Sequence, residues 1–141
     1  MAGYSSTPLS RKLGIKADAR VAIVSAPAGF SSCLEPLPEG VRVFEAARGR
    51  SDVLVFFATR RNELQRRFAK LANAIDADGG MWIAWPKRTS MVATDLTESV
   101  VREIGLEHGL VDNKVCAIDE TWSGLRFVYR LVDRPALKAA K

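Results

Sequence analysis

The stretch VLVFFATRRNELQRRFAKLANAIDADGGMWIAWP, residues 53–86, decides the fold class. It begins with a wholly apolar run at 53–57 and ends with a second one at 81–85. Apolar runs without polar alternation are typical of strands buried on both faces of a sheet. Between them, the residues that recur at the spacing of one helical face are Leu64, Phe68, Leu71 and Ile75. A buried strand, a helix over 61–75 and a second buried strand predict a parallel pair with a right-handed crossover.

Further strands are predicted on both sides of this unit. The apolar runs before it lie at 21–25 and 41–45, and those after it lie at 114–118 and 125–131. Residues 119–124 are too few for a crossover helix, so the last two strands should be antiparallel.

Two helices complete the predicted secondary structure. One spans 95–110, where Asp95 or Thr94 can cap the helix and Glu98 follows Asp95 at the spacing of a capping box. A short one lies between Thr7 and Gly14. Asp78-Gly79-Gly80 is interpreted as the turn that ends helix 61–75.

This order of elements resembles a truncated class I methyltransferase. We expect a single Rossmann-like, three-layer α/β domain over residues 1–132, followed by a flexible basic tail at 133–141. Its six-stranded, mostly parallel sheet should have the order 2-1-3-4-6-5, with the sixth strand reversed in a C-terminal antiparallel hairpin. Compared with the full methyltransferase fold, one strand and one helix are missing between Glu45 and Val53.

Composition narrows the class of protein. The 141 residues suit one domain, and the formal net charge of +5 leaves an anionic partner open. No apolar stretch approaches the roughly 18 residues that a membrane-spanning helix needs, and the N-terminus lacks the apolar core of a signal peptide. We therefore expect a cytoplasmic protein without a membrane partner. Cys33 and Cys116 are predicted to be small buried residues rather than a disulfide scaffold.

The carboxyl ends of the parallel strands are the expected ligand site, because open α/β sheets bind ligands there. Glu45 is placed to accept hydrogen bonds from hydroxyls, Lys87 and Arg88 to pair with anionic groups, and Trp122 to stack on a flat ligand or to pack over the end of the sheet. The full set of candidates is Pro27, Gly29, Glu45, Lys87, Arg88, Asp119 and Trp122.

The loop after the first strand departs from the methyltransferase pattern. Those enzymes approach their adenosyl cofactor through a glycine-rich loop, since backbone must come close to the ligand. Here residues 25–29 hold one glycine and one proline. Glu45 stands where an acidic residue would hold the ribose hydroxyls. S-adenosylmethionine is therefore a candidate cofactor, but the loop that would hold it has fewer glycines than the methyltransferase pattern requires.

The sequence gives little support for nucleic-acid binding, metal binding, or the hydrolase and nucleotide-binding motifs. Arg66, Arg67 and Lys70 give helix 61–75 a basic outer face that could contact phosphates of nucleic acid. Metal-ligand motifs, GxSxG and the Walker loop do not occur, and the single histidine, His108, sits near the end of a helix. We assign no catalytic residues and no metal ligands.

Several segments resemble the bacterial family catalogued as domain of unknown function 3052. They are Tyr4 to Gly14, Trp85-Pro86-Lys87, Thr94 to Thr97, Gly109 to Ile118 and Asp119 to Phe127. The resemblance covers nearly the whole chain. It implies a small cytoplasmic protein of Rossmann-like character, and it implies no activity.

The sequence favours a non-catalytic domain over an enzyme. We expect it to bind a small polar ligand or a protein partner, and so to act as a binding or regulatory module. One alternative is a minimal methyltransferase that uses S-adenosylmethionine. The other is an RNA-binding protein that uses the basic helix.

Overall fold

The computed structural model describes residues 7–140, so residues 1–6 of the predicted domain and Lys141 of the predicted tail lie outside it. Six strands form one mixed sheet in the order β2-β1-β3-β4-β6-β5. They are β1 (Arg20–Val24), β2 (Arg42–Phe44), β3 (Ser51–Phe57), β4 (Ile75–Pro86), β5 (Leu110–Ala117) and β6 (Trp122–Tyr129). The strands β2, β1, β3 and β4 pair in parallel, and β6 runs antiparallel to β4 and β5. The predicted strand order and reversed sixth strand are confirmed.

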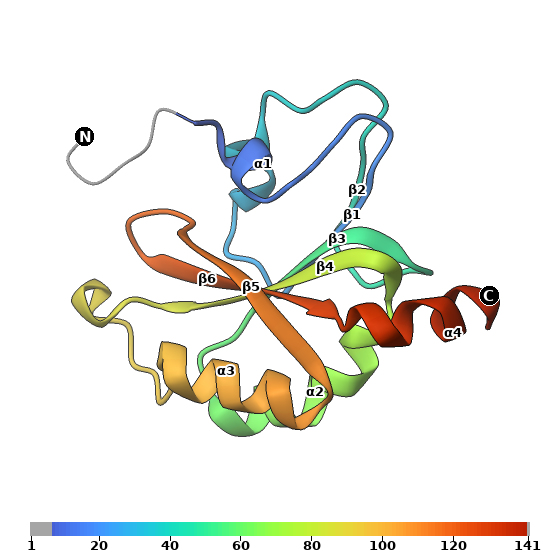
Figure 1. Cartoon of the computed structure of the whole chain (residues 1–141). Helices are drawn as coiled ribbons and strands as arrows, with labels where there is room; N and C mark the ends of the chain where they lie inside the picture. The colour runs from blue at the N-terminus through green and yellow to red at the C-terminus, as the bar shows by residue number, and fades with distance from the viewer. Residues whose placement is uncertain (1–6, 141) are drawn as a thin grey trace.

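Helices cover both faces of this sheet. Figure 1 shows α2 and α3 on one face and α1 on the other. The helices are α1 (Leu9–Lys12), α2 (Arg61–Ala72), α3 (Glu98–Glu107) and α4 (Arg134–Ala139), with short 3₁₀ turns η1 (Phe30–Leu34), η2 (Arg88–Ser90) and η3 (Leu131–Asp133). No helix in the described part of the chain is long and apolar enough to cross a membrane.

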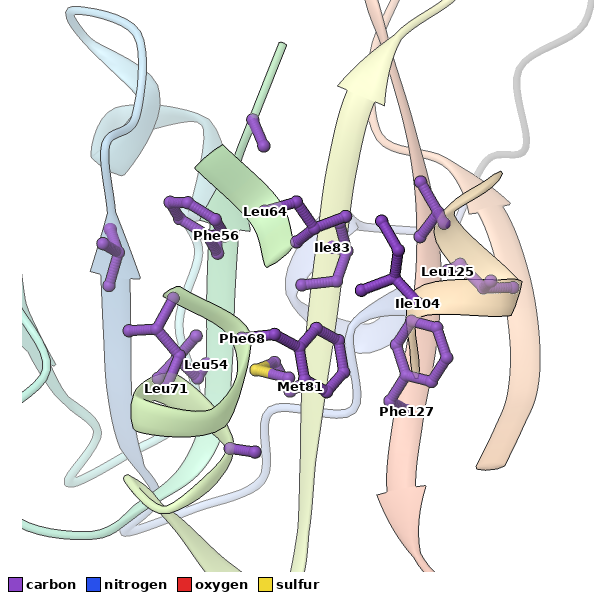
Figure 2. Close-up of a cluster of buried hydrophobic side chains, with 14 of the residues drawn as sticks. Leu54, Phe56, Leu64, Phe68, Leu71, Met81, Ile83, Ile104, Leu125 and Phe127 are labelled. Atoms are coloured by element: carbon purple, nitrogen blue, oxygen red, sulfur yellow. The ribbon is translucent and has the colours of Figure 1, made fainter. Parts of the chain in front are cut away.

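The larger core lies under α2 and α3 (Figure 2). Phe68 of α2 is fully buried and meets the ring of Phe127 edge to face, with the centroids 5.6 Å apart. Full burial of one such side chain stabilises the fold by about 1.5–3 kcal/mol. Gly105 lets α3 approach closely, because a Cβ at this position would lie 2.0 Å from Cε1 of Phe127.

A second core lies under α1 and η1. Trp82 of β4 is fully buried there, and its indole N–H donates to the carbonyl of Leu13 at 3.0 Å. Phe30 of η1 packs edge to face against Phe57 of β3, with the centroids 4.7 Å apart. These contacts attach the N-terminal segment to the sheet.

The start of β4 differs from the prediction. The sequence favours helix up to residue 75 and a turn at 78–80, but the strand already begins at Ile75. Ile75 and Ala77 are buried while Asp78 is exposed, which is the alternation of a strand with one covered face. The register between β3 and β4 shifts in this stretch, so Gly79 and Gly80 belong to an irregular strand rather than to a turn.

The C-terminal segment also differs from the prediction. Residues 134–139 form α4, where the sequence analysis expects a flexible tail. Lys138 of this helix pairs with Asp78 of β4 at 2.9 Å. Both side chains are exposed, so this pair adds little stability.

The connection from β2 to β3 is unusually short for parallel strands. Residues 45–50 cover it, whereas a crossover commonly needs a dozen or more. It is possible because β2 has only three residues. Arg20 of β1 braces the connection, since its Nε and one terminal nitrogen donate to the carbonyl of Arg48 at 3.1 and 2.9 Å. This is where the sequence predicts a missing strand and helix.

Candidate functional site

The strand order defines a switch point at the carboxyl edge of the sheet. The chain leaves β1 toward β2 on one side and leaves β3 toward β4 on the other. In open α/β sheets, ligands bind beyond the strand ends at such a point. The carboxyl ends of β1 and β3 are therefore the first candidate for a ligand site.

The loop after β1 exposes its backbone at this point. Ser25 has a φ of 58° and Gly29 a φ of 79°, so the chain turns sharply at both ends of the loop. A Cβ at Gly29 would meet nothing within 4 Å, which leaves open space in front of this backbone. Pro27 is exposed and offers no N–H, and its carbonyl accepts from the N–H of Phe30 at 3.2 Å.

Arg67 of α2 reaches into the same region. Its guanidinium lies over the ring of Phe56, 4.9 Å from the centroid, and Nη1 donates to Oγ of Ser25 at 3.3 Å. The prediction that placed Arg67 on the outer face of the helix is wrong, although Arg66 and Lys70 are exposed as expected. The sequence spacing could have indicated this position, because Arg67 lies three residues after the buried Leu64 and so borders the buried face of the helix.

Glu45 follows β2 and is exposed. Phe44 pairs in register with Ala22, so Glu45 lies beside the last part of β1, just before the chain turns back toward β3. Its carboxylate is exposed at this edge, and a role in ligand binding stays a prediction.

A cavity of about 500 Å³ opens at the end of β4, on the other side of the switch point. Lys87 and Arg88 line it, as do the buried side chains of Trp85, Pro86 and Leu96. Its remaining lining comes from Thr94, Thr97, Glu98 and Ser123. The structure thus brings the predicted residues Lys87 and Arg88 together in a cavity, beside the hydroxyl-bearing Thr94, Thr97 and Ser123, which were not among the predicted site residues.

The loop between β4 and α3 is tied to neighbouring elements. The hydroxyl of Thr94 donates to the carbonyl of Thr59 at 2.7 Å and accepts from the N–H of Leu96 at 3.0 Å. Asp95 accepts from the N–H of Arg61 at 2.7 Å, at the start of α2. The expectation that Asp95 or Thr94 caps the helix that follows them is therefore wrong.

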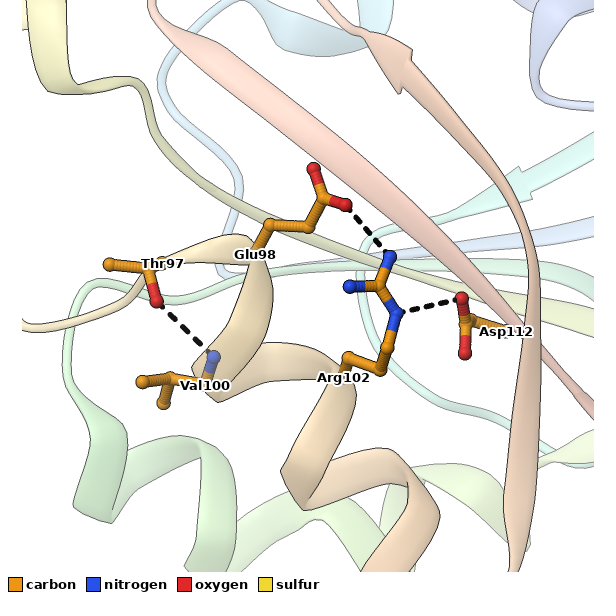
Figure 3. A network of polar contacts seen from close by, with 5 residues as sticks. All are labelled: Thr97, Glu98, Val100, Arg102 and Asp112. Carbon is orange, nitrogen blue, oxygen red and sulfur yellow. Dashed lines mark hydrogen bonds and ion pairs between the residues drawn. The ribbon is translucent and has the colours of Figure 1, made fainter.

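Thr97 caps α3 instead. Its hydroxyl accepts from the N–H of Val100 at 3.2 Å (Figure 3). Glu98 does not reach back to the cap, because Arg102 donates to its carboxylate at 2.7 Å and to Asp112 at 3.0 Å. The hydrogen bonds to Glu98 and then Asp112 raise the pKa of Arg102 above its ordinary value. This network joins α3 to β5.

Asp119 and Trp122 serve the turn between β5 and β6. One carboxylate oxygen of Asp119 accepts from the N–H groups of Thr121 and Trp122, both at 2.8 Å. The ring of Trp122 meets that of Phe57 edge to face at 5.0 Å. These contacts give Trp122 the packing role that the sequence analysis held open beside stacking.

The histidine and the two cysteines do not belong to either group of candidate site residues. His108 ends α3, where its Nδ1 lies 2.9 Å from the carbonyl of Ile104 and its ring lies over Phe68. Cys116 is half-buried, and burial raises the pKa of its thiol. Cys33 is exposed, so the prediction of a buried residue is wrong there. Within residues 7–140, no group of three or more potential ligands could hold a metal ion.

Solved structures of methyltransferases resemble this chain. Mitomycin 7-O-methyltransferase MmcR gives a TM-score of 0.64 at 9% identity over 79% of this chain, which spans about half of that enzyme's length (49%). Magnesium protoporphyrin IX methyltransferase from Synechocystis PCC 6803, with bound SAH, gives 0.56 at 12% identity over 86% of this chain and 78% of its own. Precorrin-6y C5,15-methyltransferase from Geobacter metallireducens gives 0.58 at 12% identity over 86% of both chains.

These likenesses establish the fold. At such low identity they show a class I methyltransferase-like domain, in agreement with the strand order. No family model and no curated protein matches the chain. Membership of the family of domain of unknown function 3052 stays a prediction.

Proposed function

We propose that this chain is a ligand-binding domain of methyltransferase-like fold that holds an S-adenosyl compound at the switch point between β1 and β3. One observation supports this proposal above the others: the strand order puts an open loop, a carboxylate and a guanidinium at that point. The Synechocystis methyltransferase of the same fold was solved with bound SAH.

The residues at this edge fit such a compound. The exposed carboxylate of Glu45 would accept hydrogen bonds from ribose hydroxyls. The guanidinium of Arg67 and the hydroxyl of Ser25 would donate to the carboxylate of the amino-acid part. The open backbone at Gly29 would allow close approach. Pro27 removes one backbone donor, so we expect weaker binding than a glycine-rich loop gives.

Bound S-adenosylmethionine would supply an electrophilic methyl group. The residues named above bind and orient the compound, and none of them is assigned a chemical step. Binding and methyl transfer are therefore separate proposals, and binding is tested first.

Thermal unfolding with S-adenosylmethionine and S-adenosylhomocysteine tests binding. A ligand at about 100 times its dissociation constant adds roughly 2.7 kcal/mol to the free energy of unfolding, which raises the Tm of a domain of this size by several degrees. We expect Glu45→Gln to reduce the shift. Glu39→Gln is the matched control, because Glu39 is also exposed but precedes β2 at the opposite edge. No shift with either compound at millimolar concentration would contradict the proposal.

The second candidate is a non-catalytic binding or regulatory domain for a different small polar ligand or a protein. Pro27 favours it, since this residue removes a backbone donor from the loop that would hold the adenosyl compound. This candidate would be supported if adenosyl compounds left the Tm unchanged while other small polar molecules raised it.

A further inference from the structure

The cavity at the end of β4 is lined by both apolar and cationic side chains. Trp85 and Leu96 are 5% and 3% exposed, and Pro86 is buried beside them. Lys87 and Arg88 follow directly on the chain and line the same cavity. Small-molecule sites typically combine an apolar lining with a few polar groups, in volumes of about 300–1,000 Å³. The cavity, at about 500 Å³, has this composition and size.

We propose that this cavity binds a small organic acid. Its carboxylate or phosphate head pairs with Lys87 and Arg88, and its apolar body lies against Trp85 and Leu96. The site lies beyond β4 rather than between β1 and β3, so it does not depend on the proposed adenosyl site. It extends the role predicted for Lys87 and Arg88, which is to pair with anionic groups, and it adds a second ligand to the carboxyl edge.

The charge balance of the cavity favours an anion over a cation. Glu98 is the acidic residue in the lining, and its carboxylate already accepts a hydrogen bond from Arg102 at 2.7 Å. Figure 3 shows this carboxylate turned toward the guanidinium. Against this one carboxylate, Lys87 and Arg88 bring two positive charges to the lining.

The backbone that presents these cations is fixed. The N–H of Lys87 donates to the carbonyl of Thr121 at 2.7 Å, and the carbonyl of Lys87 accepts from Oγ and the N–H of Ser90 at 2.6 and 3.0 Å. The far end of the same loop is held by the hydrogen bond from Thr94 to Thr59. A fixed frame lowers the entropic cost of binding, because the backbone of this loop is already ordered.

Benzoate, phenyl phosphate and benzamide are suitable probes. Benzamide has nearly the shape of benzoate without its charge, so the ratio of their dissociation constants isolates the contribution of the cations. Binding is followed by the backbone amide resonances of the full chain in solution. The variant is the double substitution Lys87→Gln and Arg88→Gln. The charge-matched control is Arg42→Gln with Lys70→Gln, because both residues are exposed on other elements.

We expect saturable shifts at residues 85, 87, 88, 94–98 and 123, with benzoate or phenyl phosphate binding at least about tenfold more tightly than benzamide. The double variant should lose this ratio and the control should keep it. A tighter phenyl phosphate or a tighter benzoate both support the proposal and identify the head group. Equal affinities for acid and amide, shifts at other residues, or an unchanged ratio in the double variant would each overturn it. Shifts caused by S-adenosylhomocysteine at residues 25, 26, 28 and 29 report on the adenosyl site alone, so the two proposals fail separately.

Discussion

The guanidinium of Arg67 lies 4.9 Å from the centroid of the Phe56 ring and donates to the hydroxyl of Ser25 at 3.3 Å. One side chain of α2 therefore contacts the ends of both strands that flank the switch point. This contact has a structural role that can be measured without any ligand.

Replacing Arg67 by Gln should lower the free energy of unfolding by about 1 kcal/mol, because the cation–π contact and one side-chain hydrogen bond are lost. Arg66→Gln is the matched control one residue away, and its effect should stay within about 0.5 kcal/mol, since Arg66 is exposed. Urea unfolding of both variants measures the difference. Equal effects would show that Arg67 is solvated.

The same helix allows a test of RNA binding. If its outer face binds RNA, the combined change of Arg66→Gln and Lys70→Gln should weaken the affinity for a short RNA and reduce its dependence on salt. Arg67 contributes less to that face, because it turns toward the sheet. Filter binding over a series of salt concentrations measures both quantities. Affinity that is the same at low and high salt would argue against RNA as a partner.

Gly105→Ala should have two opposing effects on stability, a gain in helix propensity and a loss in core packing. Alanine favours a helix over glycine by about 1 kcal/mol, but its Cβ would lie 2.0 Å from Cε1 of Phe127. Overpacking of a core costs about 1–3 kcal/mol, so we expect a net loss of about 1 kcal/mol. The double variant Gly105→Ala with Phe127→Leu should cost less than the sum of the single changes. Additive losses in chemical unfolding would refute the contact.

Thr97→Ala should destabilise the protein by about 1 kcal/mol, because the N–H of Val100 loses its capping hydroxyl. Ser99→Ala changes an exposed hydroxyl in the first turn of the same helix and serves as the control. Its effect should stay within about 0.5 kcal/mol. Thermal unfolding that ranks the two variants in the opposite order would contradict Thr97 as the cap.

Tyr129 should make stability depend on pH in the alkaline range. Its hydroxyl donates to the carbonyl of Ala72, and burial raises the pKa of the phenol above its ordinary value. A group with a raised folded pKa contributes stability that is complete below the unfolded pKa, near 10, and is lost as pH rises through the folded pKa.

Tyr129→Phe therefore tests this group. It should cost about 1 kcal/mol at neutral pH, and its difference from the parent chain should shrink as pH rises above about 10. Urea unfolding over that range provides the measurement. A difference that stays constant with pH would show that the phenol does not titrate with folding.

The sequence predicted the sheet because its signals are local. Apolar runs mark β1, β3 and β4, and the short turn after β5 requires an antiparallel partner. The start of β4 was missed because Gly79 and Gly80 resemble a turn, whereas the partner strand β3 determines the pairing there.

The candidate site was predicted less completely, because several of its contacts join residues that are far apart in the sequence. Lys87 and Arg88 were found because they follow a strand that can be recognised in the sequence. The capping of α2 by Asp95 and the reach of Arg67 to Ser25 join residues 34 and 42 positions apart. No periodic pattern reports contacts of this kind, since they depend on how the helices sit on the sheet.

The short connection between β2 and β3 is a place where the fold can accept an insertion. Residues 45–49 are exposed, and the nearby brace is the contact of Arg20 with the carbonyl of Arg48. Extra polypeptide inserted between Ala46 and Ala47 would project from the surface and leave both cores untouched. The connection is thus a natural entry point for engineering, where a further structural unit or a reporter domain can be added to the smallest version of this scaffold.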